Sequence, residues 1–340
     1  MFKLSLNIPT YNRCLELQRN LDELVSQIRV INCQDSVEIN ISDNGSLDKT
    51  SDMIKSFLEK NQDIHINYRR METNQGPDAN FITAMKMANG EYSILYGDDD
   101  YLIEGGMKKI LELITFNPEV PMFLTNRMNI NHKGGVLGVE SFLREDIQTR
   151  IFDFSSEDTV RSYFSLCNEY TLGGCLSFIS SVIYKTDILK EVGEYDNHFT
   201  GTNYAFLYYW WNYLLKGNKL LYCNEYFLYS TTSGATNNNY GSGLKRILVD
   251  VKGISKVAEL VFVGDKKKYR ADFLAAANKC NSNAHIFNCF LRQRAQGYNE
   301  LLPNLSLFGW SERKINEFLM TVSWKNLIIG IIGIIIRKHR

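Results

Sequence analysis

Short apolar runs alternate with segments of helical spacing along the first hundred residues. The strand-like runs cover residues 3–8, 37–44, 64–70 and 92–97. Between them, apolar residues recur three and four positions apart, which predicts amphipathic helices over 14–28, 46–60 and 76–90. Three strand–helix repeats predict an α/β fold whose mainly parallel sheet is covered by helices.

The pattern is less regular further along the chain. A strand over 122–130 is expected, then a strand-like and helical stretch over 175–189, an aromatic helix over 204–217 and a strand over 218–230. The polar, glycine-rich residues 231–243 suit a mobile loop or a domain boundary. Helical patterns follow. We therefore predict one α/β domain over residues 1–235 and a helical extension over 240–340.

Polar side chains follow three of the predicted strands directly. They are Thr10–Asn12, Asp43–Asn44 and Asp98–Asp100. In open parallel sheets, ligands bind beyond the carboxyl ends of the strands. The sequence therefore predicts a ligand site at this edge of the sheet.

The three consecutive carboxylates, Asp98 to Asp100, repel one another unless something compensates their charge. One interpretation is a hard divalent cation, Mg²⁺ or Mn²⁺, which prefers carboxylate oxygens and keeps substrate phosphates as further ligands. The other is an N-cap, in which Asp99 or Asp100 begins a helix over 102–111. The two other polar clusters expected nearby favour the cation.

Two further segments have a structural and a binding interpretation. Asp43, in "SDNGS", suits an Asx-turn, and it also suits a hydrogen bond to a base or ribose. The Gly-Pro turn at 76–77, followed by Asp78, offers amides to a phosphate or is a plain loop. The chain contains neither G-x-G-x-x-G nor G-x-x-x-x-G-K-[ST], so dinucleotide-binding and P-loop sites lack their motifs.

Composition adds limits on compartment and partners. The 340 residues carry no net charge, which gives no argument for nucleic acid. Residues 244–340 nevertheless hold 17 Lys and Arg against 7 Asp and Glu, so this part suits an anionic partner or an ordinary solvated surface. Seven cysteines without C-x-x-C spacing indicate free thiols in a reducing compartment. No signal-peptide pattern precedes the first strand, so we expect a cytoplasmic protein.

Two apolar segments have alternative interpretations. Trp210 and Trp211 lie in the aromatic helix and suit either a buried core or stacking on a sugar. The apolar run over 327–336 is too short for a spanning helix, which needs about 20 residues. With its basic flanks it suits an anchor lying on the membrane surface, or a contact within the core or a homo-oligomer.

Four segments together carry a family resemblance: "LNIPTYNR" (6–13), "ISDNGSLDKT" (41–50), "NQGPDANF" (74–81) and "ANGEYSILYGDDD" (88–100). In this order and spacing they resemble family 2 glycosyltransferases of the GT-A fold. Within the family, the chain is most similar to bacterial O-antigen sugar transferases, including abequosyltransferases that use CDP-dideoxyhexoses.

The resemblance implies roles for particular residues. Asp43 would contact the base, Asp98 the ribose or sugar, and Asp100 the metal that neutralises the diphosphate leaving group. The remaining nucleotide-binding residues would be Pro9, Thr10, Tyr11, Arg13, Asn44, Asp78 and Asp99. Asp98 and Asp100 would act in catalysis.

The acceptor side departs from the family pattern. Many members carry a Glu-Asp pair whose Asp deprotonates the acceptor, whereas this chain has Thr202–Asn203 near that place. Inverting transfer needs such a base. Asp196, Glu169 and His198 are candidates, with Asp196 preferred, and each also suits a surface or capping role. Alternatively, the reaction retains configuration and the leaving phosphate takes the proton.

The resemblance thus implies transfer of a sugar from a nucleotide-sugar donor to a lipid-linked surface glycan, at the inner face of the cell membrane. A CDP-dideoxyhexose donor with retention is one form of this hypothesis, and inverting transfer from a UDP- or dTDP-sugar is another. A non-catalytic nucleotide-sugar-binding subunit is the rival from another class. A nucleotidyltransferase would need a Gly-rich phosphate loop that "IPTYNR" does not provide.

Overall fold

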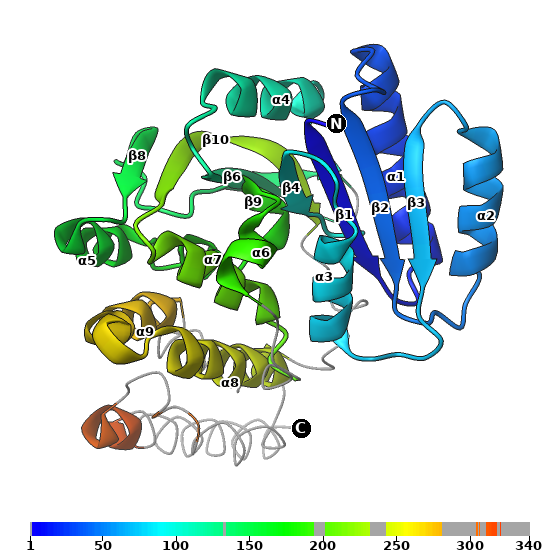
Figure 1. Ribbon diagram of the computed structural model, residues 1–340. Coiled ribbons are helices and arrows are strands. Elements are labelled where there is room, and N and C mark those ends of the chain that lie inside the picture. The colour runs from blue at the N-terminus through cyan, green and yellow to red at the C-terminus, as the bar shows by residue number, and fades with distance from the viewer. Residues whose placement is uncertain are drawn as a thin grey trace, which may run out of the picture.

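The computed structural model describes residues 2–131, 134–193, 201–231 and 243–280, together with 304, 306, 311–317 and 320. Over these residues the chain forms a helix-covered sheet whose strands follow the order β3-β2-β1-β4-β9-β6-β10-β5. Strands β7 and β8 pair with β6 and β10 beside this path. The arrangement is drawn in Figure 1.

The first half of the sheet is parallel. It contains β1 (Leu4–Thr10), β2 (Val37–Asp43), β3 (His65–Arg70) and β4 (Tyr92–Leu95). Every residue of β1, β2 and β4 is buried, as expected for parallel strands covered on both faces. The prediction of a parallel sheet is confirmed for these four strands, whereas most pairings in the rest of the sheet are antiparallel. Strand β1 continues through Pro9 to Thr10 rather than ending before the proline.

The second half of the sheet is mixed. Strand β9 (Val182–Lys185) runs antiparallel to both β4 and β6 (Met122–Ile130), and β10 (Lys219–Thr231) runs parallel to β6. Short strands complete it: β5 (Asp100–Leu102), β7 (Val136–Glu140) and β8 (Arg150–Asp153). Residues that are distant in the chain therefore become neighbours here.

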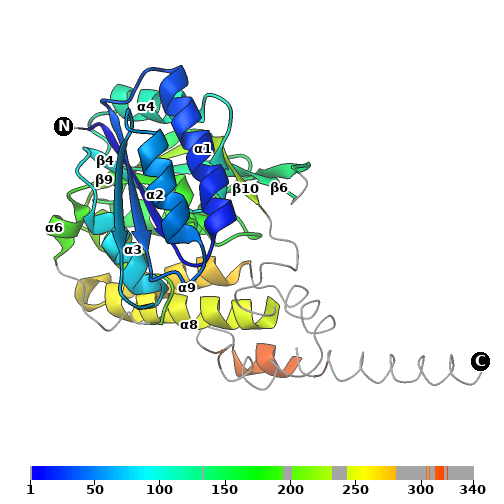
Figure 2. The same ribbon diagram turned by 90° about the vertical axis from the view of Figure 1, so that its right-hand side faces the viewer.

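One face of the sheet is covered by α1 (Cys14–Val30), α2 (Thr50–Lys60) and α4 (Gly106–Phe116). Their apolar positions form one core with the strands, and α1 supplies Leu17, Leu21, Leu24 and Ile28 to it. Figure 2 shows α1 and α2 side by side along the parallel half. The spacing that predicted these helices is thus the spacing that buries them.

The other face carries α3 (Pro77–Lys86), α5 (Glu157–Leu166), α6 (Ile188–Val192) and α7 (Ala205–Leu214). Helices α8 (Gly243–Val261) and α9 (Arg270–Asn278) pack beneath α7 and α5 (Figure 1). The two tryptophans of α7 are fully buried in this core. The alternative that Trp210 or Trp211 stacks on a sugar is therefore wrong.

The extension predicted over 240–340 is helical in α8 and α9, which share one core with α5 and α7. Its boundary at 235–240 and the apolar run 327–336 lie outside the described residues. No helix among the described residues is long and apolar enough to cross a bilayer.

Candidate functional site

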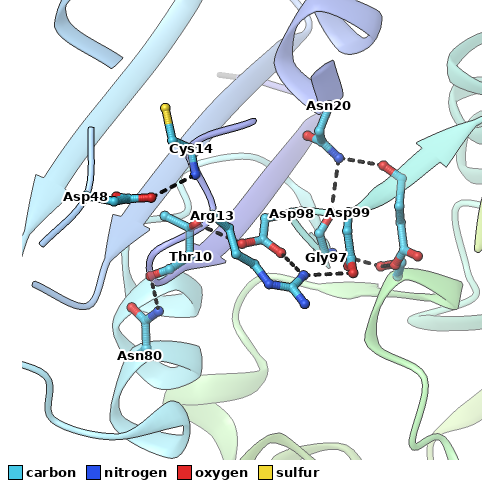
Figure 3. A network of polar contacts seen from close by, with 11 residues as sticks. Thr10, Arg13, Cys14, Asn20, Asp48, Asn80, Gly97, Asp98 and Asp99 are labelled. Carbon is cyan, nitrogen blue, oxygen red and sulfur yellow. Dashed lines mark hydrogen bonds and ion pairs between the residues drawn. The ribbon is translucent and has the colours of Figure 1, made fainter. Parts of the chain in front are cut away.

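The ends of β1 and β4 bring the N-terminal polar cluster against the three carboxylates. The Thr10 hydroxyl donates a hydrogen bond to Asp98 Oδ2 at 2.7 Å. The Arg13 guanidinium lies 2.9 Å from Asp98 Oδ1 and 2.7 Å from Asp99 Oδ2. Figure 3 shows Arg13 reaching across both carboxylates. The sequence prediction that these clusters meet is confirmed.

Burial governs the charge of this group. Desolvation raises the pKa of Asp98 to about 6, although Arg13 opposes the rise. Burial alone would lower the pKa of Arg13, but the charges of Asp98 and Asp99 outweigh it and raise that pKa. One guanidinium therefore faces two carboxylates, with a third next to them. The cluster attracts a further cation.

Asp100 begins strand β5 and pairs with Ser230 of β10. The Ser180 hydroxyl, in the short helix Ile179–Ser181, accepts a hydrogen bond from the Gly97 amide at 2.8 Å and donates one to Asp100 Oδ2. Asp100 Oδ1 accepts no hydrogen bond from the described part of the chain. Burial, followed by the charge of Asp99, raises the pKa of Asp100 to about 7.

The N-cap interpretation of these aspartates is wrong. Helix α4 begins at Gly106, after Gly105 in a left-handed conformation, and no side chain caps it. The loop is instead fixed by Asn20 of α1, whose amide donates to the carbonyl oxygens of Gly97 and Asp100. A side chain at position 97 would place its Cβ 2.6 Å from Asp100 Oδ2, so glycine is needed there.

The chemistry of this group suits a divalent cation. Asp100 offers a buried, otherwise unpaired carboxylate oxygen that has a raised pKa, and Asp98 and Asp99 add negative charge. Within the described residues, no set of three His, Cys, Asp or Glu side chains converges on one point. A metal here would take few protein ligands and complete its shell with substrate phosphate and water, as Mg²⁺ commonly does.

Asp43 is fully buried at the end of β2. Its Oδ1 accepts the Ser46 amide at 2.8 Å, three residues on instead of the two residues of the predicted Asx-turn, and its Oδ2 accepts the Tyr68 hydroxyl at 2.9 Å. Arg70 lies 3.6 Å from the same Oδ2. Both oxygens thus have partners within the protein, so Asp43 also orients Tyr68 and Arg70.

Three other predicted nucleotide-binding residues lie near this edge in different environments. Asn44 is held by the turn before α3, donating to Asn74 and Gly76 and accepting from the Gln75 amide. Pro9 is buried in β1, and Tyr11 is half-buried just beyond it. Their contact with a nucleotide stays a prediction.

Asp78 points away from the carboxylate cluster, toward the start of α7. One oxygen accepts the Thr202 hydroxyl and the Ala205 amide, and the other accepts the Asn203 amide, all at 3.0 Å. Asp78 is buried, so it anchors the Thr202–Asn203 segment to α3. Sequence reasoning missed this link because the partners are more than 120 positions apart.

Of the three candidates for an acceptor base, the structure describes only Glu169. Glu169 lies exposed in the loop after α5. Asp196 and His198 lie outside the described residues. Thr202 and Asn203 are engaged with Asp78, and Asn203 adopts a left-handed conformation with φ of 60°.

Similarity to known proteins agrees with this geometry. Residues 5–164 match the model of the family described as glycosyl transferase family 2. Over 215 residues, 60% of this chain, the sequence is 31% identical to abequosyltransferase RfbV of Salmonella typhimurium. The match covers 59% of RfbV, so the chain spans less than two thirds of that relative.

Solved structures show the same fold. TarS 1–349 of S. aureus in complex with UDP-GlcNAc superposes with a TM-score of 0.59 at 18% identity, covering 90% of this chain and 80% of that one. The mannosyltransferase PcManGT from Pyrobaculum calidifontis, in complex with GDP-Man and Mn²⁺, gives 0.54 at 12% identity, covering 96% and 87%. The fold is therefore of the GT-A type.

Proposed function

We infer that this chain, whose residues 5–164 match the family model described as glycosyl transferase family 2, is an enzyme that moves a sugar from a nucleotide-sugar donor to a surface glycan. One observation carries the inference: Thr10, Arg13 and the Asp98–Asp100 carboxylates gather at the carboxyl ends of β1 and β4. This is the edge where parallel sheets bind ligands.

Asp98, Asp100 and Arg13 have different environments, and we assign each a different role. Asp100, with Mg²⁺ or Mn²⁺, would hold the diphosphate, and the metal would stabilise its charge as it leaves. Asp98, fixed by Thr10 and Arg13, would accept hydrogen bonds from the ribose or sugar. Arg13 also keeps Asp98 and Asp99 close together. The remaining work is positioning of the donor.

For the donor, we propose a CDP-3,6-dideoxyhexose such as CDP-abequose, whose sugar is transferred with retention of the anomeric configuration. Similarity to the abequosyltransferase RfbV supports abequose as the transferred sugar. Retention is supported by the Thr202–Asn203 segment, which offers no carboxylate and is tied to Asp78. The alternative is inverting transfer from a UDP- or dTDP-sugar, with a base such as Asp196. The product's anomeric configuration, measured by NMR, separates the two.

A panel of CDP-, UDP-, dTDP- and GDP-sugars with Mn²⁺ or Mg²⁺ tests the function. We expect one donor to release its nucleotide in a metal-dependent reaction, and EDTA to stop the release. Nucleotide binding with no turnover of any donor, even with an O-antigen lipid extract present, would favour a non-catalytic binding subunit instead.

The acceptor and location form a separate part of the proposal. We place the enzyme at the inner face of the cell membrane, acting on a lipid-linked glycan, because residues 244–340 carry an excess of basic side chains. Sedimentation with vesicles tests this. We expect binding to vesicles containing anionic phosphatidylglycerol and release at high salt. Equal binding to purely zwitterionic vesicles would contradict the electrostatic basis.

A further inference from the structure

A row of paired residues crosses the second half of the sheet, starting from the carboxylate cluster. Asp100 of β5 pairs with Ser230 of β10, and Ser230 pairs with Asn129 of β6. Neighbouring strands lie about 4.8 Å apart, so the backbone of Asn129 lies roughly 10 Å from that of Asp100. This distance places β6 where a second substrate could meet a donor held at Asp100.

An ion pair stands on the same face of this row. Arg127, two residues before Asn129, lies opposite Glu140 of β7 and bonds it at 2.8 and 3.0 Å. Asn129 donates a further hydrogen bond to Glu140 at 2.8 Å. The Arg127 guanidinium also lies 4.0 Å from the centroid of the Phe178 ring. Glu140 is therefore held rigidly.

The charge state of Glu140 follows from these contacts. Burial would raise its pKa, but the charge of Arg127 and the hydrogen bonds outweigh burial and lower the pKa. Glu140 is thus a fixed anion, suited to accept hydrogen bonds rather than to remove a proton. Arg127 also donates a hydrogen bond to the Ser230 hydroxyl at 3.4 Å, and Ser230 pairs with Asp100, so the ion pair adjoins the carboxylate cluster.

A cavity of about 220 Å³ opens beside Glu140. Its polar lining includes Asn129, Glu145 and Asn168, and Leu137 and Tyr170 add apolar surface. Tyr170 is 82% exposed, so its aromatic ring is open to solvent beside the cavity. Asn168 Oδ1 accepts the Tyr170 amide at 2.9 Å, which orients the loop. The side-chain amide group of Asn168 donates no hydrogen bond within the described part of the chain, whereas its backbone amide donates to the Phe142 carbonyl oxygen at 3.0 Å.

We propose that this cavity, between the β6–β7 hairpin and the loop at 168–170, binds one sugar residue of the acceptor. Hydroxyl groups would donate to Glu140 and Glu145 and accept from Asn168, while the apolar face of the ring would lie on Tyr170. Such mixed polar and aromatic linings suit hydroxyl-rich rings. The proposal rests on the proposed function, which it deepens by locating the acceptor site.

Saturation-transfer NMR with methyl glycosides of glucose, galactose, mannose and rhamnose tests the site directly. We expect a saturation-transfer signal from at least one glycoside. That signal should be at least fivefold weaker with Tyr170→Ala and with Asn168→Ala. Phe116→Ala is the matched control, since Phe116 is also a highly exposed aromatic side chain but lies on α4. It should leave the signal unchanged.

The proposal would be overturned if no glycoside gave a saturation-transfer signal with wild type, or if wild type and both cavity variants gave equal signals. Binding of Mn²⁺ with each nucleoside diphosphate is measured on the same samples. The cavity variants should bind nucleotide like wild type. If wild type binds no nucleoside diphosphate, the proposed function is overturned, whatever the glycosides show. Failure of the proposed function can therefore be distinguished from failure of the acceptor-site proposal.

Discussion

The two halves of the sheet build their parts of the site by different means. In the parallel half, Thr10 and Asp43 are the last residues of β1 and β2, and Asp98 lies three residues after β4, so the order of the chain alone brings them to one edge. In the mixed half, Arg127, Glu140 and Ser230 meet only through strand pairing. The proposed donor site is therefore local in sequence, whereas the proposed acceptor site beside it is not.

The largest expected effect comes from removing Asp100, the carboxylate that we propose binds the metal. Asp100→Ala should lower the rate of nucleotide release by about 10³-fold, because several kcal/mol of charge stabilisation are lost. Asp99→Asn is the control and should cost far less, since Asp99 is more exposed and already pairs with Arg13. Steady-state kinetics at saturating Mn²⁺ measure both. Equal losses would remove the distinction between the two aspartates.

The contact that joins the halves at α3 and α7 should matter for stability. Asp78→Ala removes a buried carboxylate that accepts three hydrogen bonds, so the free energy of unfolding should fall by about 3 kcal/mol. Asp52→Ala, an exposed aspartate in the first turn of α2, is the matched control and should change little. Urea unfolding followed by circular dichroism gives both values. An unchanged midpoint for Asp78→Ala would show that α7 needs no anchor.

The pH dependence of stability should report the protonation of Asp98 and Asp100. In EDTA, the folded protein binds protons at Asp98 and Asp100 more tightly than the unfolded chain, because both pKa values are raised, to about 6 and about 7. Their contribution to stability is therefore present below pH 4 and is lost as pH rises to 7.

Each proton bound only by the folded state changes the free energy of unfolding by about 1.4 kcal/mol per pH unit. Thermal unfolding of Asp100→Asn, whose side chain mimics the neutral acid, should therefore show a weaker fall between pH 4 and 7. Added Mn²⁺ should stabilise wild type more at pH 8 than at pH 5. Identical pH profiles for wild type and variant would contradict the raised pKa of Asp100.

The smallest effect should come from changing Ser180, whose hydroxyl donates a hydrogen bond to Asp100. Ser180→Ala removes the hydrogen bond that orients Asp100, and we expect Mn²⁺ affinity to fall about tenfold. Ser181→Ala is a close control, because that buried hydroxyl has no partner in the described part of the chain. Isothermal titration with Mn²⁺ and nucleotide compares them. Equal affinities would assign Ser180 a structural role only.

The sequence predicted the parallel half well because its signals are local. Apolar runs marked β1, β2 and β4, and polar residues directly after them marked the site. Asn20 could also have been found, as a polar residue on the buried face of an amphipathic helix. Ser180 had no such signal.

The prediction failed where distant pairing decides. Asp100 is drawn into β5 by β10, although its sequence also suited a helix cap. Asp78 turned to α7 because three unpaired donors begin that helix. The cavity beside Glu140 depends on three segments spread over more than 40 residues. No local pattern encodes these contacts.

The missing side chain at Gly97 has a consequence for how this sequence can vary. A methyl group there would displace the carboxylate that Ser180 holds, so the glycine and the serine serve one contact although 83 positions separate them. Among natural variants that keep this contact, we expect both residues to be kept, and where one changes we expect the other to change with it. The glycine at position 97 is thus required by the distance to the Asp100 carboxylate and not by the residues next to it in the chain.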